Sequence, residues 1–190
     1  VNGESVTTTL HVDPTQFAST TDNGTYYAQP AEMGNVVMYA KTKASGNPVE
    51  LRYTPFSTVL EFEINASNEV LAGKQTEITI QSLTLTAPSE TTIIAGDFSF
   101  NFDGPSITPA ATGGSNAITM HFLDNNQYTT VLSTTKRTLK AKMCLMPISG
   151  NLAGWKIEVN TSAGTFSKTL TETDKDGKRT DLIAGQVHKI

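Results

Sequence analysis

The sequence is poor in the residue types that mark a catalytic, metal-binding or disulfide-stabilised protein. Its 190 residues include one cysteine, one tryptophan and three histidines. With a single cysteine no intrachain disulfide can form, so the fold depends on its hydrophobic core. An HExxH pair, CxxC pairs, a GxSxG elbow and Gly-rich phosphate loops are all missing from the sequence. We therefore predict no catalytic residue, no metal site and no cofactor, and a protein that is not an enzyme.

Charge is also scarce. Charged residues make up 17% of the chain, and the formal net charge is -4. A negative chain is a poor partner for nucleic acid, whose phosphates need a basic surface. The basic residues cluster only at Lys136, Arg137, Lys140 and Lys142, and the last two lie on the polar face of an alternating segment, where we expect them to guard a sheet edge.

Long apolar runs and helical periodicity are missing as well, and no segment is apolar enough to predict a transmembrane helix. Apolar residues return instead at every second position, as in Leu60, Phe62 and Ile64 or in Phe98 and Phe100. This period is typical of strands with one face in a core and one in water. About 30 threonines occupy many of the polar positions, a bias that favours a protein outside the cytoplasm.

Turn residues divide this pattern into short strands, which predicts an all-β fold, an antiparallel β-sandwich with Greek-key connections. A phase change between Ile80 and Leu83 predicts a β-bulge near Gln81 and Ser82. Asp13 and Pro14 favour one helical turn over residues 14–18. We predict strands near residues 5–12, 36–41, 50–53, 58–65, 76–86, 97–102, 117–123, 128–132, 138–146, 154–160, 164–170 and 185–190.

The longest low-complexity stretch runs from Gly104 to Asn116 and is rich in proline, glycine and alanine. We predict that it separates two small sandwich lobes, residues 1–114 and 115–190. One continuous sandwich with a long loop is the alternative.

Few residues carry recognisable chemistry. Glu172, Asp174 and Asp176 alternate before Gly177, like the first half of a calcium loop. Ile183 stands where a bidentate glutamate would be needed, so cation binding and a solvated hairpin both stay open.

Other polar and aromatic candidates have simpler interpretations. Cys144 and Trp155 lie within apolar alternation and are expected in the core, whereas His11, His121 and His188 are expected to be solvated strand residues. A carbohydrate-binding module would need exposed aromatic rings, and Tyr26, Tyr27 and Tyr39 are the candidates.

Several segments, taken in order, resemble the fimbrillin family, the pilus subunits and related surface lipoproteins of Bacteroidetes. The resembling segments are residues 35–40, 51–64, 78–85, 94–98, 144–147 before the strand led by Trp155, and 182–190. The resemblance covers most of residues 35–190.

This resemblance implies a fimbrial, structural or adhesive protein at the cell surface, anchored to the outer membrane as a lipoprotein or built into an extracellular fimbria. Its partners would be other fimbrial subunits, joined by donated β-strands, and surface ligands. The sequence shows no lipobox cysteine and no donor extension after Ile190, so a stalk, tip or anchor subunit and a fragment all stay open. A non-catalytic carbohydrate-binding module of a surface glycan system is the alternative function.

Overall fold

The structure, a computed structural model, describes residues 7–20, 25–28, 36–42, 50–67, 71, 76–104, 106–124, 127–171 and 181–190. Its named elements are β-strands, most of them paired antiparallel, which confirms the predicted all-β class. A helical hydrogen bond joins Leu71 N to Ser67 O at 3.2 Å. Among the described residues, no helix is long and apolar enough to cross a membrane.

The strands are β1 Thr7–Val12, β2 Thr15–Thr20, β3 Thr25–Ala28, β4 Met38–Ala40, β5 Tyr53–Pro55, β6 Thr58–Asn65, β7 Glu77–Thr86, β8 Gly96–Asn101, β9 Ser106–Pro109, β10 Ala117–His121, β11 Leu123–Asp124, β12 Gln127–Tyr128, β13 Val131–Ser133, β14 Thr138–Leu145, β15 Ile148–Ser149, β16 Lys156–Thr161, β17 Gly164–Thr169, β18 Asp181–Leu182 and β19 Val187–Lys189.

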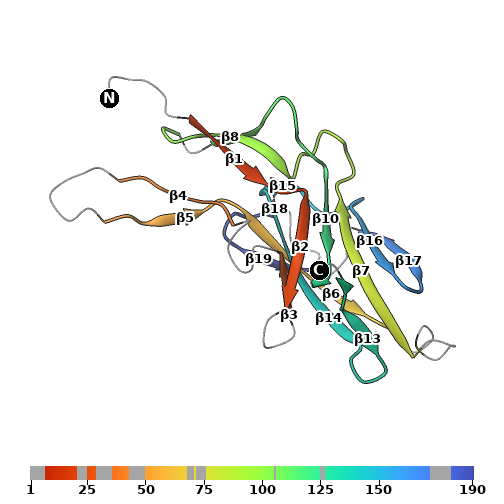
Figure 1. Cartoon of the computed structure of the whole chain (residues 1–190). Coiled ribbons are helices and arrows are strands. Elements are labelled where there is room, and N and C mark those ends of the chain that lie inside the picture. The colour runs from red at the N-terminus through yellow and green to blue at the C-terminus, as the bar shows by residue number, and fades with distance from the viewer. Residues whose placement is uncertain are drawn as a thin grey trace.

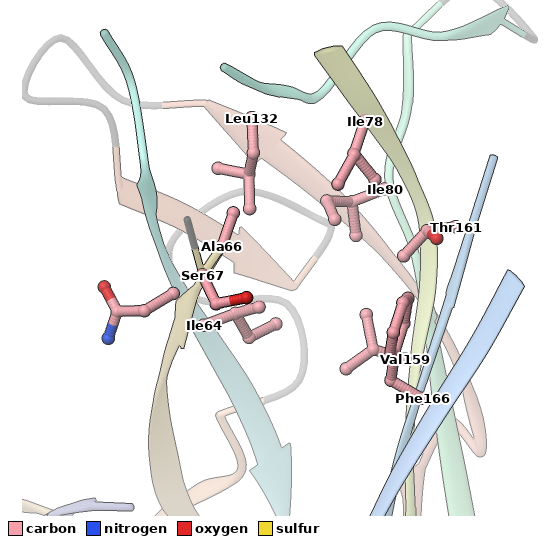
Figure 2. A pocket seen from close by; sticks show the side chains of 10 residues that line it. Ile64, Ala66, Ser67, Ile78, Ile80, Leu132, Val159, Thr161 and Phe166 are labelled. Atoms are coloured by element: carbon pink, nitrogen blue, oxygen red, sulfur yellow. The ribbon is translucent and has the colours of Figure 1, made fainter. Parts of the chain in front are cut away.

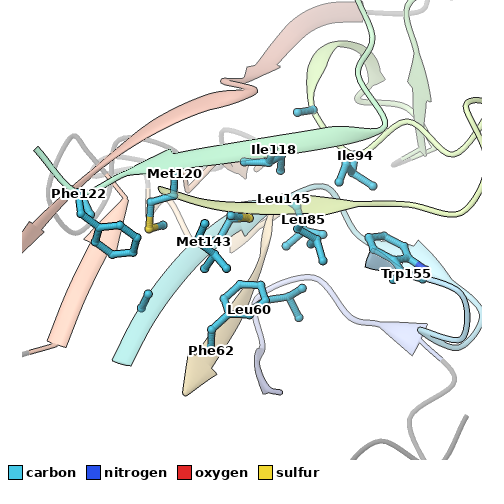
Figure 3. Close-up of a cluster of buried hydrophobic side chains, with 14 of the residues drawn as sticks. Leu60, Phe62, Leu85, Ile94, Ile118, Met120, Phe122, Met143, Leu145 and Trp155 are labelled. Atoms are coloured by element: carbon cyan, nitrogen blue, oxygen red, sulfur yellow. The ribbon is translucent and has the colours of Figure 1, made fainter. Parts of the chain in front are cut away.

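The main sheet folds back on itself to make two layers around one core (Figure 1). Its strand order is β17-β16-β7-β10-β2-β3-β14-β6-β19. Figure 3 shows Met120 of β10 and Leu85 of β7 on one side of the core, with Met143 of β14 and Phe62 of β6 on the other. These side chains are at most 2% exposed, so the alternation in the sequence becomes a dry interior between two layers.

Strand β2 joins the two layers. Residues Thr15 to Phe17 pair in parallel with β10, and Ala18 to Thr20 pair antiparallel with β3. The helical turn predicted for residues 14–18 is therefore wrong. Asp13 Oδ1 accepts a hydrogen bond from Thr15 N at 2.8 Å, so the side chain that could cap a helix turns the chain into a strand instead.

The predicted bulge is confirmed by the register between β7 and β16. Asn160 pairs with Ser82 and Thr161 pairs with Ile80, so Gln81 is an extra residue on β7. The extra residue lets Ile80 and Leu83 both point into the core, where each is at most 2% exposed.

The Gly104–Asn116 stretch contains a strand that the sequence did not predict. Strand β9 pairs with β8, which lies between β9 and β1 in a separate three-stranded sheet. Pro109 ends β9 opposite Phe98, a position that an edge strand tolerates because its outer side needs no amide donor.

The division into residues 1–114 and 115–190 stays a prediction. Several ladders cross it, since β7 pairs with β10, β13 and β16, while β6 pairs with β14 and β19. The crossing ladders weigh against two ranges that fold separately, because each range would lose the neighbours of its central strand.

We expect residues 1–114, produced alone, to show no cooperative unfolding transition, because β6 and β7 would lack their partner strands. Chemical denaturation followed by circular dichroism measures this, and adding residues 115–190 in trans should restore the transition. A cooperative transition of either fragment by itself would instead establish two independent lobes.

Candidate functional site: the open flank of the sandwich

One flank of the sandwich is closed by β2 and by a buried side chain. Gln16 is fully buried, and its Nε2 donates to Cys144 O at 2.6 Å and to Asp13 O at 3.2 Å. Cys144 N in turn donates to Gln16 Oε1 at 3.2 Å. The ladder between β3 and β14 covers Lys140 to Lys142 and does not reach Cys144. The Gln16 side-chain amide pairs with the backbone N and O of Cys144 in place of a strand residue.

The opposite flank has a different edge structure, because β17 and β19 are the last strands of the two layers in the described part of the chain. Among the described strands, β17 pairs with β16 alone, and all six residues of β17 are exposed. Strand β19 pairs in parallel with β6, over Val59 to Glu61. The ladder extends to Ile190, whose N donates to Glu61 O at 2.9 Å and whose O accepts from Glu63 N at 3.3 Å.

A cavity of about 260 Å³ opens between the layers at this flank (Figure 2). Its walls come from β6, β7, β13, β16 and β17, and most of them are apolar. We call this cavity the flank groove. It is lined by Ile64, Asn65, Ala66, Ser67, Ile78, Ile80, Leu132, Val159, Thr161 and Phe166.

Phe166 is an exposed apolar side chain at the edge of the core. It pairs with Val159 across the β16–β17 hairpin, and both side chains line the flank groove. Yet Phe166 is 46% exposed, although Leu83, the β7 residue that pairs with Val159, is 0% exposed. The inner face of β17 therefore presents apolar surface that the β6 layer does not reach.

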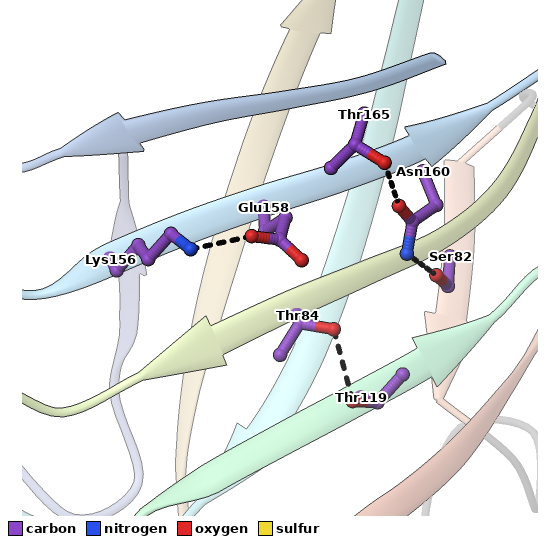
Figure 4. A network of polar contacts seen from close by, with 7 residues as sticks. All are labelled: Ser82, Thr84, Thr119, Lys156, Glu158, Asn160 and Thr165. Atoms are coloured by element: carbon purple, nitrogen blue, oxygen red, sulfur yellow. Dashed lines mark hydrogen bonds and ion pairs between the residues drawn. The ribbon is translucent and has the colours of Figure 1, made fainter.

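The outer face of the same sheet is polar and satisfies itself (Figure 4). Asn160 Nδ2 donates to Ser82 Oγ at 3.2 Å, and Asn160 Oδ1 accepts from Thr165 Oγ1 at 2.6 Å. The hydroxyls of Thr84 and Thr119 lie 3.0 Å apart in a hydrogen bond. These polar side chains are paired with one another, whereas the side of β16 and β17 that faces the flank groove carries the apolar Val159 and Phe166.

The predicted role of Lys140 and Lys142 as guards of a sheet edge is wrong. Strand β14 lies between β3 and β6 and is not an edge. Lys142 Nζ lies 3.4 Å from Glu61 Oε2, and Lys189 Nζ lies 3.6 Å from Glu61 Oε1. Glu61 therefore pairs with both Lys142 and Lys189 on neighbouring strands of the second layer.

The histidines lie apart from one another. His11 Nδ1 is 2.6 Å from Asp97 Oδ1 at an exposed position, and the ring of His121 lies 5.7 Å from that of Phe17. His188 was expected to be solvated but is 3% exposed, and its Nε2 accepts a hydrogen bond from Ile183 N at 3.0 Å. This hydrogen bond links β19 to the turn that precedes it.

The candidate metal-binding and sugar-binding residues are not brought together among the residues that the structure describes. Within the described ranges, no three His, Cys, Asp or Glu side chains gather to hold a metal ion, and Glu172, Asp174 and Asp176 lie outside those ranges. Tyr39 is half-buried, with its ring 4.8 Å from that of Phe56. The side chains of Tyr26 and Tyr27 also lie outside what the structure describes.

Comparison with known proteins supports the fold. No family model matches the sequence, and no curated protein matches it either. A crystal structure of a presumed cell adhesion protein from Bacteroides uniformis superposes with a TM-score of 0.52 at 15% identity, over 97% of this chain and 60% of that one. A fimbrial protein from Bacteroides vulgatus gives a TM-score of 0.30 at 15% identity, over 74% of this chain and 51% of that one, which is too low to support an argument.

At 15% identity the likeness to the adhesion protein shows a shared fold and nothing finer. The present chain spans about 60% of that protein's length. Neither protein is named as an enzyme.

Cys144 and Trp155 are in the core as predicted, at 7% and 2% exposure. Burial raises the pKa of the Cys144 thiol to about 11, because the thiolate would lose its hydration there. The thiol is therefore protonated and shielded at neutral pH, which makes it a structural residue.

We expect Cys144 to resist a thiol reagent such as 5,5′-dithiobis(2-nitrobenzoate) at pH 8 in the folded protein and to react at once in denaturant. The absorbance of the released thiolate measures the rate. A matched control is Thr134→Cys in a Cys144→Ser background, because residue 134 is exposed and its thiol should react in the folded state. Equal rates for the two thiols in folded protein would contradict the buried position.

Proposed function

We propose that this chain is a non-catalytic structural or adhesive protein of the cell surface that assembles with like subunits by β-strand donation, as fimbrial subunits do. The likeness of fold to a presumed adhesion protein and the fimbrillin-like segments of the sequence both support this function. The flank groove is the single observation that carries it.

The groove combines two features that an extended peptide satisfies together. The outer edge of β17 offers backbone donors and acceptors, and the apolar walls offer a place for alternate side chains. A strand that buries about four side chains of valine or leucine size would gain roughly 6–12 kcal/mol before the costs of ordering. Because association itself costs about 4–15 kcal/mol, the fit of the strand in the groove would decide how firmly subunits hold together.

The proposed location follows from this assembly. A protein joined through strand edges works as part of a chain or as its anchor, and the threonine-rich, weakly charged surface suits an extracytoplasmic setting. We place the protein at the cell surface, in a fimbria or attached to the outer membrane as a lipoprotein.

We expect a peptide of this chain's own strand sequence to bind the folded protein and to raise its melting temperature by several degrees at saturation, since a ligand specific for the native state stabilises it. The peptides to test are Ser5–Val12 and Leu182–Ile190, each beside a scrambled version. Differential scanning calorimetry measures the shift.

The matched variants for this experiment are Phe166→Thr, in the flank groove, and Tyr128→Thr, which is similarly exposed at 44% but does not line the groove. Phe166→Thr should reduce the peptide-induced shift and Tyr128→Thr should not. No shift with either strand peptide would count against assembly by strand donation.

A further inference from the structure

His188 differs from the other two histidines because its ring is buried. It is 3% exposed, although Val187 and Lys189 on either side of it are exposed. Its Nε2 accepts a hydrogen bond from Ile183 N at 3.0 Å. A backbone amide can only donate, so Nε2 carries a lone pair and the ring is neutral, with its proton on Nδ1.

This hydrogen bond closes the turn between β18 and β19. Within the turn, Gln186 N donates to Ile183 O at 3.2 Å. Gln186 O in turn accepts from Val59 N at 3.0 Å, which fastens the turn to β6. The His188 ring therefore ties the first residue of the turn to β19, while the last residue of the turn is tied to β6.

The turn also lies closely against the segment that joins β5 to β6. Gly185 N donates to Ser57 O at 2.9 Å, and a Cβ on Gly185 would lie 2.5 Å from Pro55 Cγ. Gly185 has a φ of 73°, a conformation that favours glycine. The ladder between β19 and β6 starts directly after this turn, at Val187 and Val59, so a turn that opens would loosen the start of β19.

The described charged groups of the ladder between β19 and β6 lie on its outer face. Leu60 of β6 is opposite His188 and is fully buried, so the ring lies on the apolar inner face of this ladder. Glu61 Oε1 is 3.6 Å from Lys189 Nζ on the outer face, and Glu63 is exposed.

The charged groups of the other elements around β19 have partners of their own. On β18, Asp181 is exposed and accepts a hydrogen bond from Gly150 N at 3.0 Å through Oδ1. On the facing layer, Lys156 and Glu158 pair with each other on the outer face (Figure 4). A proton on His188 would therefore enter an interior around which the described carboxylates are already engaged.

We propose that His188 is an acid-sensitive lock on the turn of residues 183–186. Protonation would place an N–H at Nε2 against the N–H of Ile183 and would bury a charge, so the closed turn holds the neutral ring. In the open turn the ring lies in water, where histidine takes up a proton below about pH 6.5. Acid therefore favours the open turn, and neutral pH favours the closed one. The lock lies within one chain and does not depend on strand donation.

The linkage between proton uptake and opening gives the size of the effect. If the ring stays neutral in the closed turn, the opening equilibrium rises about tenfold between pH 7.5 and pH 5.5. Exposed aspartates and glutamates stay ionised over this interval, because they titrate at about pH 4. The histidines are therefore the side chains that change charge between these two pH values.

We expect the amide of Val59 to report this opening, because its hydrogen bond to Gln186 O is lost when the turn detaches. Its protection from hydrogen exchange, corrected for the intrinsic rate at each pH, should fall about tenfold from pH 7.5 to pH 5.5. Exchange followed by nuclear magnetic resonance measures this protection. The circular dichroism spectrum should stay the same, since only the turn opens.

Matched variants separate His188 from other effects of acid. His188→Gln can still offer an oxygen to Ile183 N but does not titrate, so its Val59 protection should be independent of pH. His121→Gln removes a half-buried histidine of β10 and should keep the tenfold fall. An equal fall in the wild type and in His188→Gln, or no fall in the wild type, would overturn the lock.

The ring itself gives a second measurement, which does not depend on a variant that folds. At pH 6, where an unfolded histidine is largely charged, the nitrogen resonances of His188 should show a neutral ring with its proton on Nδ1. A proton on Nε2, or a charged ring at that pH, would contradict the lock. Loss of the whole circular dichroism signal at pH 5.5 would place the acid sensitivity in the sandwich as a whole and would also overturn a lock confined to the turn.

Discussion

The sandwich depends on a single strand that belongs to both layers, and on the buried amide that makes this possible. When β2 leaves β10 for β3, the backbone at Cys144 would lose its neighbour in the interior, where an unpaired amide or carbonyl costs about 1–3 kcal/mol. The Gln16 side chain donates to Cys144 O and accepts from Cys144 N, so it replaces the missing peptide unit. This one contact closes a flank that would otherwise admit water or another chain.

The two flanks of the sandwich are therefore unequal. On the closed flank, β2 and Gln16 satisfy every backbone group at Cys144, and the surrounding side chains are buried. On the other flank, β17 and β19 are the last described strands of their layers, and the flank groove opens between the end of β6 and the facing β7, β16 and β17. The physical requirement that buried polar groups be paired and apolar groups covered is met on the closed flank, whereas the flank groove leaves apolar surface such as Phe166 exposed on the other.

The sequence predicts the parts of this structure that depend on local pattern. Alternation located β6 at Thr58–Asn65 with its exact bounds, and the phase change between Ile80 and Leu83 located the bulge. Strand β2 was missed because Asp13 and Pro14 signal a helix start, and only the distant contact with Cys144 decides between a helix and a strand. Lys140 and Lys142 were placed at an edge because neighbours in a sheet cannot be deduced from one strand's pattern.

The flank groove also could not be predicted from the pattern of a single strand. Phe166 alternates as a core residue should, and nothing in its own segment reveals that the facing layer stops short of it. A small-molecule site of this size would need several convergent polar groups to orient its ligand, yet among the described residues the groove's polar side chains are Asn65, Ser67 and Thr161. Apolar walls beside the outer edge of β17 suit the extended chain proposed above, because such a chain offers apolar side chains and backbone hydrogen bonds at once.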